Sequence, residues 1–194
     1  QEKDYRVLEE EARARLEASN ELNKRCRSTA ICGVFLACTR RDPLRLFAEP
    51  VRVPGYESHI SNPIDLGLIR SKIIEDKYTS FGSFVSDMKL LYTNAISFNP
   101  PSSIYARTAE AILDCLDNAQ RRAKDWMEAV KISHSSHQRH VANGSSSSDN
   151  PFVALEDTWP GATSALKDDV CMKDIVKADF LRTKENENAY YGSL

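Results

Sequence analysis

The sequence contains few glycines, no long apolar run and no nucleophile motif. Only 7 of its 194 residues are glycine, and no glycine-rich loop of the kind that holds phosphate groups occurs. No stretch approaches the roughly 20 consecutive apolar residues that cross a membrane, and the N-terminus lacks the basic-then-apolar layout of a secretory signal. Serine, histidine and aspartate are present, but in no nucleophile motif. We therefore expect neither an enzyme nor a membrane partner, and we assign no catalytic residue.

A strong charge of either sign is also lacking. The formal net charge is −2, with 28% charged and 41% hydrophobic residues, which is typical of a soluble globular protein. Basic clusters at 24–27, 40–41 and 121–122 could contact nucleic acid, but cations are also favoured at helix C-terminal ends by the helix dipole. We prefer the second interpretation, so direct nucleic-acid binding is not expected.

Cysteine and histidine do not form a metal-binding pattern. The five cysteines are scattered, as free thiols in a reducing compartment would be: Cys26, Cys32, Cys38, Cys115 and Cys171. His134, His137 and His140 recur every three residues, but no cysteine or carboxylate completes a site, and we expect no metal or cofactor. Because the sequence starts at Gln1 without a methionine, we expect a fragment of a longer intracellular protein.

Helical patterns account for most of the chain. The predicted helices cover residues 4–26, 28–41, 63–75, a stretch from about 80 or 83 to 98, and one from about 104 to 127. Leu8, Ala12 and Leu16, with Leu22 as a candidate fourth member, form a narrow stripe, so we expect the first helix to dock by one edge. Asn62 is the expected N-cap of the third helix, with Pro63 at its first position. No strand pattern occurs, which predicts an all-α bundle.

Composition divides the chain into four parts. Residues 1–27 are an N-terminal helical extension and residues 28–132 are the bundle. Residues 133–150, rich in Ser, His and Asn, are a flexible linker. Residues 151–194 are a C-terminal tail with a weak helical pattern, which we expect to be disordered or to dock on something else: Leu166, Val170, Ile175, Val176 and Phe180.

The most informative stretch is 92–103, where an amphipathic pattern runs into Asn99 and is stopped by Pro100-Pro101. Asn before Pro is a common turn signal and could simply end the helix. However, its neutral side chain offers donors and an acceptor, so at the mouth of an apolar pocket it can hold a neutral amide ligand. Residues 44–56 supply apolar side chains in a loop, which indicates either a packed-down segment or the wall of such a pocket.

Several of these segments together resemble a bromodomain, over roughly residues 28–122. The motifs occur in the family's order: Phe47-Ala48-Glu49-Pro50-Val51, Tyr56, Ile60-Ser61-Asn62-Pro63-Ile64-Asp65-Leu66, Phe84, Asp87, Asn94-Ala95 and Phe98-Asn99-Pro100-Pro101. The resemblance implies a left-handed four-helix bundle, here with an extra N-terminal helix and a C-terminal tail. It also implies a pocket for acetylated lysine between residues 43–62 and 99–104.

The resemblance also implies roles for single residues. The side-chain NH2 of Asn99 donates to the acetyl carbonyl, and Tyr56 reaches the same oxygen through a water. Phe47 and Val51 line the acetyl methyl group, with Val53 on the loop side. An aromatic anchor that only pins the loop remains the alternative for Tyr56.

Other positions lie farther from the acetyl group. Phe98 lies behind Asn99, with ordinary core packing as its alternative. Tyr105 gates the entrance and Ile104 points inward from the same turn, although a shift of one position would exchange the two. The rim carries Leu46, Arg45 and Pro50, so that Arg45-Leu46-Phe47 replaces the family's aromatic shelf and places a cation there. Asn94 is expected to brace the loop by hydrogen bonds.

The sequence therefore predicts a chromatin reader module. Its expected partners are acetylated histone peptides and other chromatin proteins, and it would act as a monomer within a larger nuclear protein. The alternative is a helical scaffold or dimerisation module with a degenerate pocket, in which the N-terminal helix and the C-terminal tail are the contact surfaces.

Overall fold

The computed structural model describes residues 2–142, 173–174 and 176–178, and this part of the chain is helical without strands. The helices are α1 (Glu2–Thr39), α2 (Tyr56–His59), α3 (Leu66–Ile74), α4 (Phe81–Phe98) and α5 (Ile104–Ala142). The predicted all-α fold is confirmed. None of the described helices combines the length and hydropathy required to cross a bilayer.

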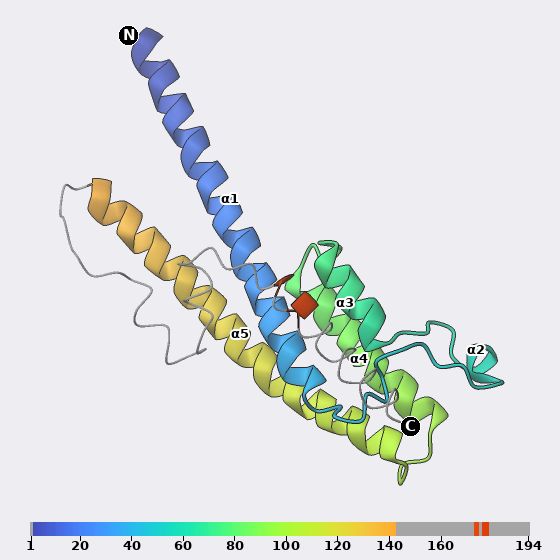
Figure 1. The fold of residues 1–194 in the computed structure, drawn as a ribbon. Helices are drawn as coiled ribbons and strands as arrows, with labels where there is room; N and C mark the ends of the chain where they lie inside the picture. Colours follow the sequence, from blue (N-terminus) through green and yellow to red (C-terminus); the bar gives the residue numbers. More distant parts are fainter. Residues whose placement is uncertain (1, 143–172, 175, 179–194) are drawn as a thin grey trace.

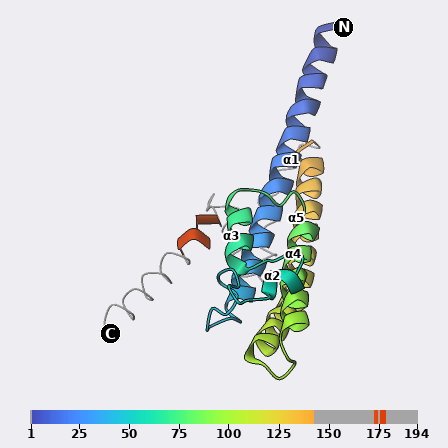
Figure 2. The same cartoon turned by 90° about the vertical axis from the view of Figure 1, so that its right-hand side faces the viewer.

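Four helices form one bundle around a common core. The long helices α1 and α5 run antiparallel and α4 packs against α5, while α3 packs against α1 and α4 (Figures 1 and 2). Both α3 and α4 face this core with residues at helical spacing: Leu66, Ile69 and Ile73 on α3, and Phe84, Met88, Leu91 and Ala95 on α4. Its largest fully buried side chains are Trp126, Phe35, Phe84, Ile69, Met88, Leu91, Ile112 and Leu116.

The expected break between the first two helices is absent, because α1 is continuous from Glu2 to Thr39. Neither proline nor glycine occurs between the two apolar patterns, so nothing in the backbone ends the helix there. The predicted docking of the first helix by one edge is confirmed only at Leu22, because Leu8 and Leu16 are exposed. Leu22 is the first residue of the stripe that packs against the core.

Helix α5 is longer than the sequence indicated. It continues to Ala142, so the expected start of the linker at residue 133 lies inside this helix. Residues 143–150 of the predicted linker lie outside the described residues. The extension of α5 lies at the end of the bundle beyond which α1 projects (Figure 1).

The starts of three helices are fixed by side-chain caps. Ser80 Oγ accepts a hydrogen bond from the backbone N–H of Ser83, and Ser103 Oγ accepts one from Ala106 (3.0 and 3.1 Å). Asp65, not Asn62, is the N-cap of α3. The predicted start at Pro63 is wrong because Asp65 already has extended backbone geometry and Leu66 is the first helical residue.

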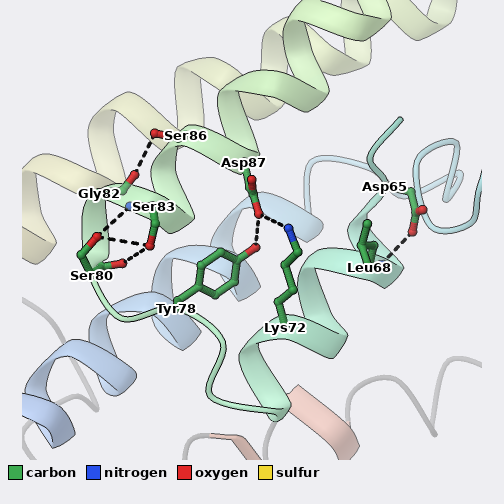
Figure 3. Close-up of polar contacts among 9 residues, drawn as sticks. All are labelled: Asp65, Leu68, Lys72, Tyr78, Ser80, Gly82, Ser83, Ser86 and Asp87. Atoms are coloured by element: carbon green, nitrogen blue, oxygen red, sulfur yellow. Dashed lines mark hydrogen bonds and ion pairs between the residues drawn. The ribbon is translucent and has the colours of Figure 1, made fainter. Parts of the chain in front are cut away.

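A half-buried carboxylate ties α3 to α4. Asp87 Oδ2 accepts hydrogen bonds from Lys72 Nζ (2.8 Å) and from the Tyr78 hydroxyl (2.7 Å), as Figure 3 shows. Burial raises the pKa of Tyr78 well above its ordinary value, and the hydrogen bond to Asp87 and its charge add to the effect. These contacts fix the loop between α3 and α4.

The described part of the C-terminal tail packs on the bundle. Val176 is only 1% exposed and belongs to the hydrophobic core, and Lys173 forms an ion pair with Asp76. Of the other positions in the predicted helical pattern, Leu166, Val170, Ile175 and Phe180 lie outside the described residues.

Candidate functional site

A cavity of about 670 Å³ opens at the end of the bundle where α4 ends and α5 begins. Its walls come from the loop between α1 and α3, from the last two turns of α4 and from the start of α5 (Figure 1). The lining residues are Leu44, Arg45, Leu46, Phe47, Ala48, Glu49, Pro50, Val51, Arg52, Val53, Tyr56, Ile64, Asp65, Leu91, Ala95, Phe98, Asn99 and Tyr105. This volume lies within the range of small-molecule sites.

Asp42 holds the first turn of the loop in place. Its side chain is only 4% exposed, and its two carboxylate oxygens accept hydrogen bonds from the backbone N–H groups of Leu46 (2.8 Å) and Phe47 (2.9 Å). Arg45, which lies between Asp42 and Leu46 in this turn, has a left-handed backbone with φ 56°. No role was predicted for Asp42 from the sequence. The known ability of Asp to bond backbone groups a few residues onward was the available signal.

The loop is also joined to the N-terminus of α3. The Phe47 carbonyl accepts a hydrogen bond from the Leu66 N–H at 2.7 Å, and Asp65 Oδ1 accepts one from Leu68 at 2.8 Å. Gly67 allows the backbone to approach closely, because a Cβ there would lie 2.7 Å from the carbonyl oxygen of Ala48. Phe47 is thereby fixed in the wall with its ring largely buried.

Tyr56 enters the cavity from the short helix α2. Gly55 precedes it with φ 85°, and the Tyr56 ring packs edge-on against Phe98 with centroids 4.9 Å apart. Burial, with a smaller contribution from the Asp65 carboxylate, raises the pKa of Tyr56 above its ordinary value. The hydroxyl is therefore protonated at neutral pH and can donate a hydrogen bond.

Asn99 lies at the C-terminal end of α4. Its backbone N–H and its side-chain Nδ2 both donate to the carbonyl oxygen of Ala95, at 3.0 and 2.9 Å. This double contact fixes the orientation of the side chain. An Asn amide has two N–H donors and an oxygen acceptor, so one N–H and Oδ1 remain without a hydrogen bond to the described residues.

Most of the remaining residues predicted to form the wall line the cavity. Val51, Val53 and Phe98 all line the cavity, and Phe98 also packs against the Tyr56 ring, so it is not only a core residue. Tyr105 lines the cavity and its ring meets Phe47 edge-on at 6.5 Å.

Ile104 does not belong to the residues that line the cavity. The inward position predicted for Ile104 is therefore wrong, because the first turn of α5 directs Tyr105 toward the cavity instead. The predicted rim residues Leu46, Arg45 and Pro50 all line the cavity.

Asn94 braces the site as predicted. It is buried, and its Nδ2 donates to the backbone carbonyl of Asn62 at 2.8 Å, which ties α4 to the loop before α3. Sequence reasoning assigned no ligand role to several lining residues: Leu44, Ala48, Glu49, Arg52, Ile64, Asp65, Leu91 and Ala95. Leu91 and Ala95 share the apolar face of α4 that leads to Asn99, so the helical spacing contained that signal.

The chemistry of this arrangement favours a neutral ligand. The lining carries two arginines, Arg45 and Arg52, and two carboxylates, Glu49 and Asp65, so its formal charges balance. The uncharged polar groups of Asn99 and Tyr56 lie among apolar side chains. Among the residues that the structure describes, no three metal-ligating side chains converge. The side chains of His134, His137 and His140 lie outside that description.

Comparison with known proteins identifies the region around the cavity. Residues 34–111 match the family model described as Bromodomain. Bromodomain-containing protein 9 of Mus musculus is 39% identical over 77 residues, which are 38% of this chain and 13% of that protein.

Two further relatives match with similar identity. Transcription factor GTE10 of Arabidopsis thaliana is 36% identical over 72 residues, covering 36% of this chain and 7% of that protein. Bromodomain and PHD finger-containing protein 3 of Homo sapiens is 34% identical over 92 residues, covering 44% of this chain and 8% of that protein. The matched region is thus a small part of each relative.

Proposed function

Because residues 34–111 form a bromodomain, a chromatin reader module, we propose that the cavity around Asn99 binds the side chain of acetylated lysine. The observation that carries the proposal is the Asn99 amide. Its contact with Ala95 fixes the group, and its second N–H is left to donate to an acetyl carbonyl. Tyr56, packed on the neighbouring Phe98, lines the same cavity, and its hydroxyl would bind the same oxygen through a water.

Selectivity for the acetylated form follows from desolvation. Acetylation converts the lysine ammonium into a neutral amide, while an unmodified lysine would have to lose water without a dedicated counter-charge. The balanced charges of the lining give no net attraction for a cation, and Asp65 Oδ1 is already used to cap α3. The acetyl methyl group would pack against Phe47 and Val51, which line the same cavity.

The proposed ligand source is an acetylated histone tail, and the proposed location is the nucleus. The names of the relatives support this choice, since they include a transcription factor and a transcription initiation factor TFIID subunit of Caenorhabditis elegans. Other acetylated chromatin proteins present the same chemistry. The proposed activity is binding without catalysis.

NMR titration of the labelled protein tests this proposal. The same histone peptide is added in its acetylated form and, in a separate titration, in its unmodified form. The acetylated peptide should shift the Asn99 side-chain amide and the Tyr56 resonances. Asn118 provides an internal reference because its Nδ2 makes the same contact, to the carbonyl four residues earlier, at 2.9 Å outside the cavity. Equal shifts with both peptides, or no shift of Asn99 at saturation, would refute the proposal.

A further inference from the structure

The N-terminal half of α1 carries an apolar face that the described residues leave uncovered. Tyr5, Leu8, Ala12 and Leu16, here called the α1 stripe, follow one another at helical spacing. Tyr5, Leu8 and Leu16 are 70%, 59% and 62% exposed. Helix α5 diverges from α1 toward this end, and the first turns of α1 project beyond the bundle (Figure 1).

The α1 stripe continues an interface that is already formed. Beyond the polar Ser19, the same face of the helix carries Leu22, half-buried against the core, and Cys26, which is fully buried. An exposed apolar face that extends a packed one is a common sign of a helical partner.

We propose that the α1 stripe is a homodimer interface, in which α1 of a second copy packs antiparallel across a two-fold axis near Ala12. Such an axis places Leu8 opposite Leu16 of the second copy, and Leu16 opposite Leu8 of the second copy. Ala12 meets its own equivalent, where its small side chain allows the two backbones to approach. A two-fold interface of this kind uses the same surface on both copies.

The charges beside the α1 stripe select the antiparallel direction. Glu9 and Arg13 each follow a stripe residue and form one flank of the helix, while Glu11 and Arg15 each precede a stripe residue and form the other. A two-fold axis perpendicular to two antiparallel helices brings equivalent flanks together. Glu9 then faces Arg13 of the second copy, and Glu11 faces Arg15 of the second copy. These four opposite-charge contacts outnumber the two like contacts that Arg13 and Glu11 make with their own equivalents.

A parallel pair would bring opposite flanks together at the same level. Glu9 would then lie beside Glu11 of the second copy, and Arg13 beside Arg15 of the second copy, which is repulsive. Within one chain, Arg15 and Glu11 approach to 3.6 Å, but both side chains are more than half exposed and such pairs contribute little. They can therefore exchange partners when two copies meet.

The two bundles lie at opposite ends of this dimer. The cavity lies at the end of α1 remote from the α1 stripe, so it stays open in both copies (Figure 1). Dimerisation therefore does not depend on the proposed ligand. The proposal revises the sequence-based expectation of a monomer.

Sedimentation equilibrium of the 194-residue chain, over a concentration series reaching the millimolar range, measures the association directly. The mass should rise from 21.8 kDa toward twice that value. Leu8→Asp/Leu16→Asp should remain at the lower mass, whereas Val7→Asp, exposed on the same helix but off the stripe, should behave as the wild type. A wild-type chain that stays at 21.8 kDa throughout would overturn the proposal.

Charge reversal in pairs tests whether the flanking charges meet across the interface, with little change in helix propensity, and a single reversal then tests the direction of pairing. Glu9→Arg/Glu11→Arg and Arg13→Glu/Arg15→Glu should each fail to dimerise alone and should associate when mixed. Circular dichroism confirms that each variant keeps its helix content. The single variant Glu9→Arg should weaken an antiparallel dimer, so stronger association of this variant would instead support a parallel pair and overturn the proposed geometry.

Discussion

The rings of Tyr56 and Phe98 meet edge-on, with centroids 4.9 Å apart and planes inclined by 80°. Tyr56 comes from the short helix α2, while Phe98 is the last residue of α4 and directly precedes Asn99. The contact therefore sets the position of the Tyr56 hydroxyl relative to the Asn99 amide. Two polar groups that are 43 residues apart in the sequence are held at one cavity by an apolar contact.

Tyr56→Phe separates the role of the hydroxyl from that of the ring. The substitution keeps the edge-on contact with Phe98, so thermal stability should be close to that of the wild type. Affinity for an acetylated peptide should fall by about 1 kcal/mol, because a water-mediated hydrogen bond is lost. Calorimetric titration measures the affinity, and an unchanged value would mean that Tyr56 is only an aromatic anchor.

Asp42→Asn should loosen the loop that carries Phe47. The carboxylate accepts two backbone N–H groups, whereas an amide directs its own NH2 toward one of them. We expect the free energy of unfolding to fall by about 1–3 kcal/mol, with weaker peptide binding because Leu46 and Phe47 line the cavity. Denaturant unfolding measures the first effect, and Asp125→Asn, at an exposed position of α5, provides the matched control. Equal stability of the two variants would contradict this role of Asp42.

Local sequence information was sufficient to predict where α4 ends. Pro100-Pro101 cannot continue the helix, so Asn99 had to lie at its end, and the face that carries Leu91 and Ala95 had to lead to it. The brace from Asn94 was also predicted correctly. These features depend on residues close together in the sequence.

Features set by tertiary contacts could not be predicted in the same way. The Phe47 carbonyl binds the Leu66 N–H from 19 residues away, which helps to fix the start of α3 after Asp65 instead of after Asn62. The exposure of Leu8 and Leu16 depends on how far the bundle extends along α1, which helical spacing does not contain. Whether Ile104 or Tyr105 faces the cavity depends on how α5 is rotated about its axis relative to the loop, and the sequence does not contain that rotation.

Alkaline pH should destabilise the fold through Tyr78. Its pKa is raised in the folded state, where it donates to Asp87, so below about pH 10 the phenol is protonated in both states and the stabilisation is complete. Above that pH the unfolded chain releases the proton first. The free energy of unfolding should then fall by about 1.4 kcal/mol per pH unit for this group. Urea unfolding at a series of pH values above 10 measures this dependence. The unfolding free energy of Tyr78→Phe should fall less steeply with pH than that of the wild type, and an identical pH dependence would contradict the assignment.

Val176→Ala tests the packing of the C-terminal segment. The side chain is buried within the hydrophobic core, and its truncation should cost about 1–2 kcal/mol. The melting temperature should fall accordingly. Lys177→Ala, at the next and exposed position, should leave it unchanged. If both variants melt at the wild-type temperature, the segment does not stabilise the bundle.

The most direct test of the central claim is calorimetric titration of an acetylated histone peptide into the wild type, Asn99→Ala and Asn118→Ala. Asn118 makes the same amide contact to a helix carbonyl, but outside the cavity. The account predicts wild-type affinity for Asn118→Ala and a loss of about tenfold or more, close to 1.4 kcal/mol, for Asn99→Ala. Equal affinities of Asn99→Ala and the wild type would contradict the assignment of Asn99 as the acetyl-lysine anchor.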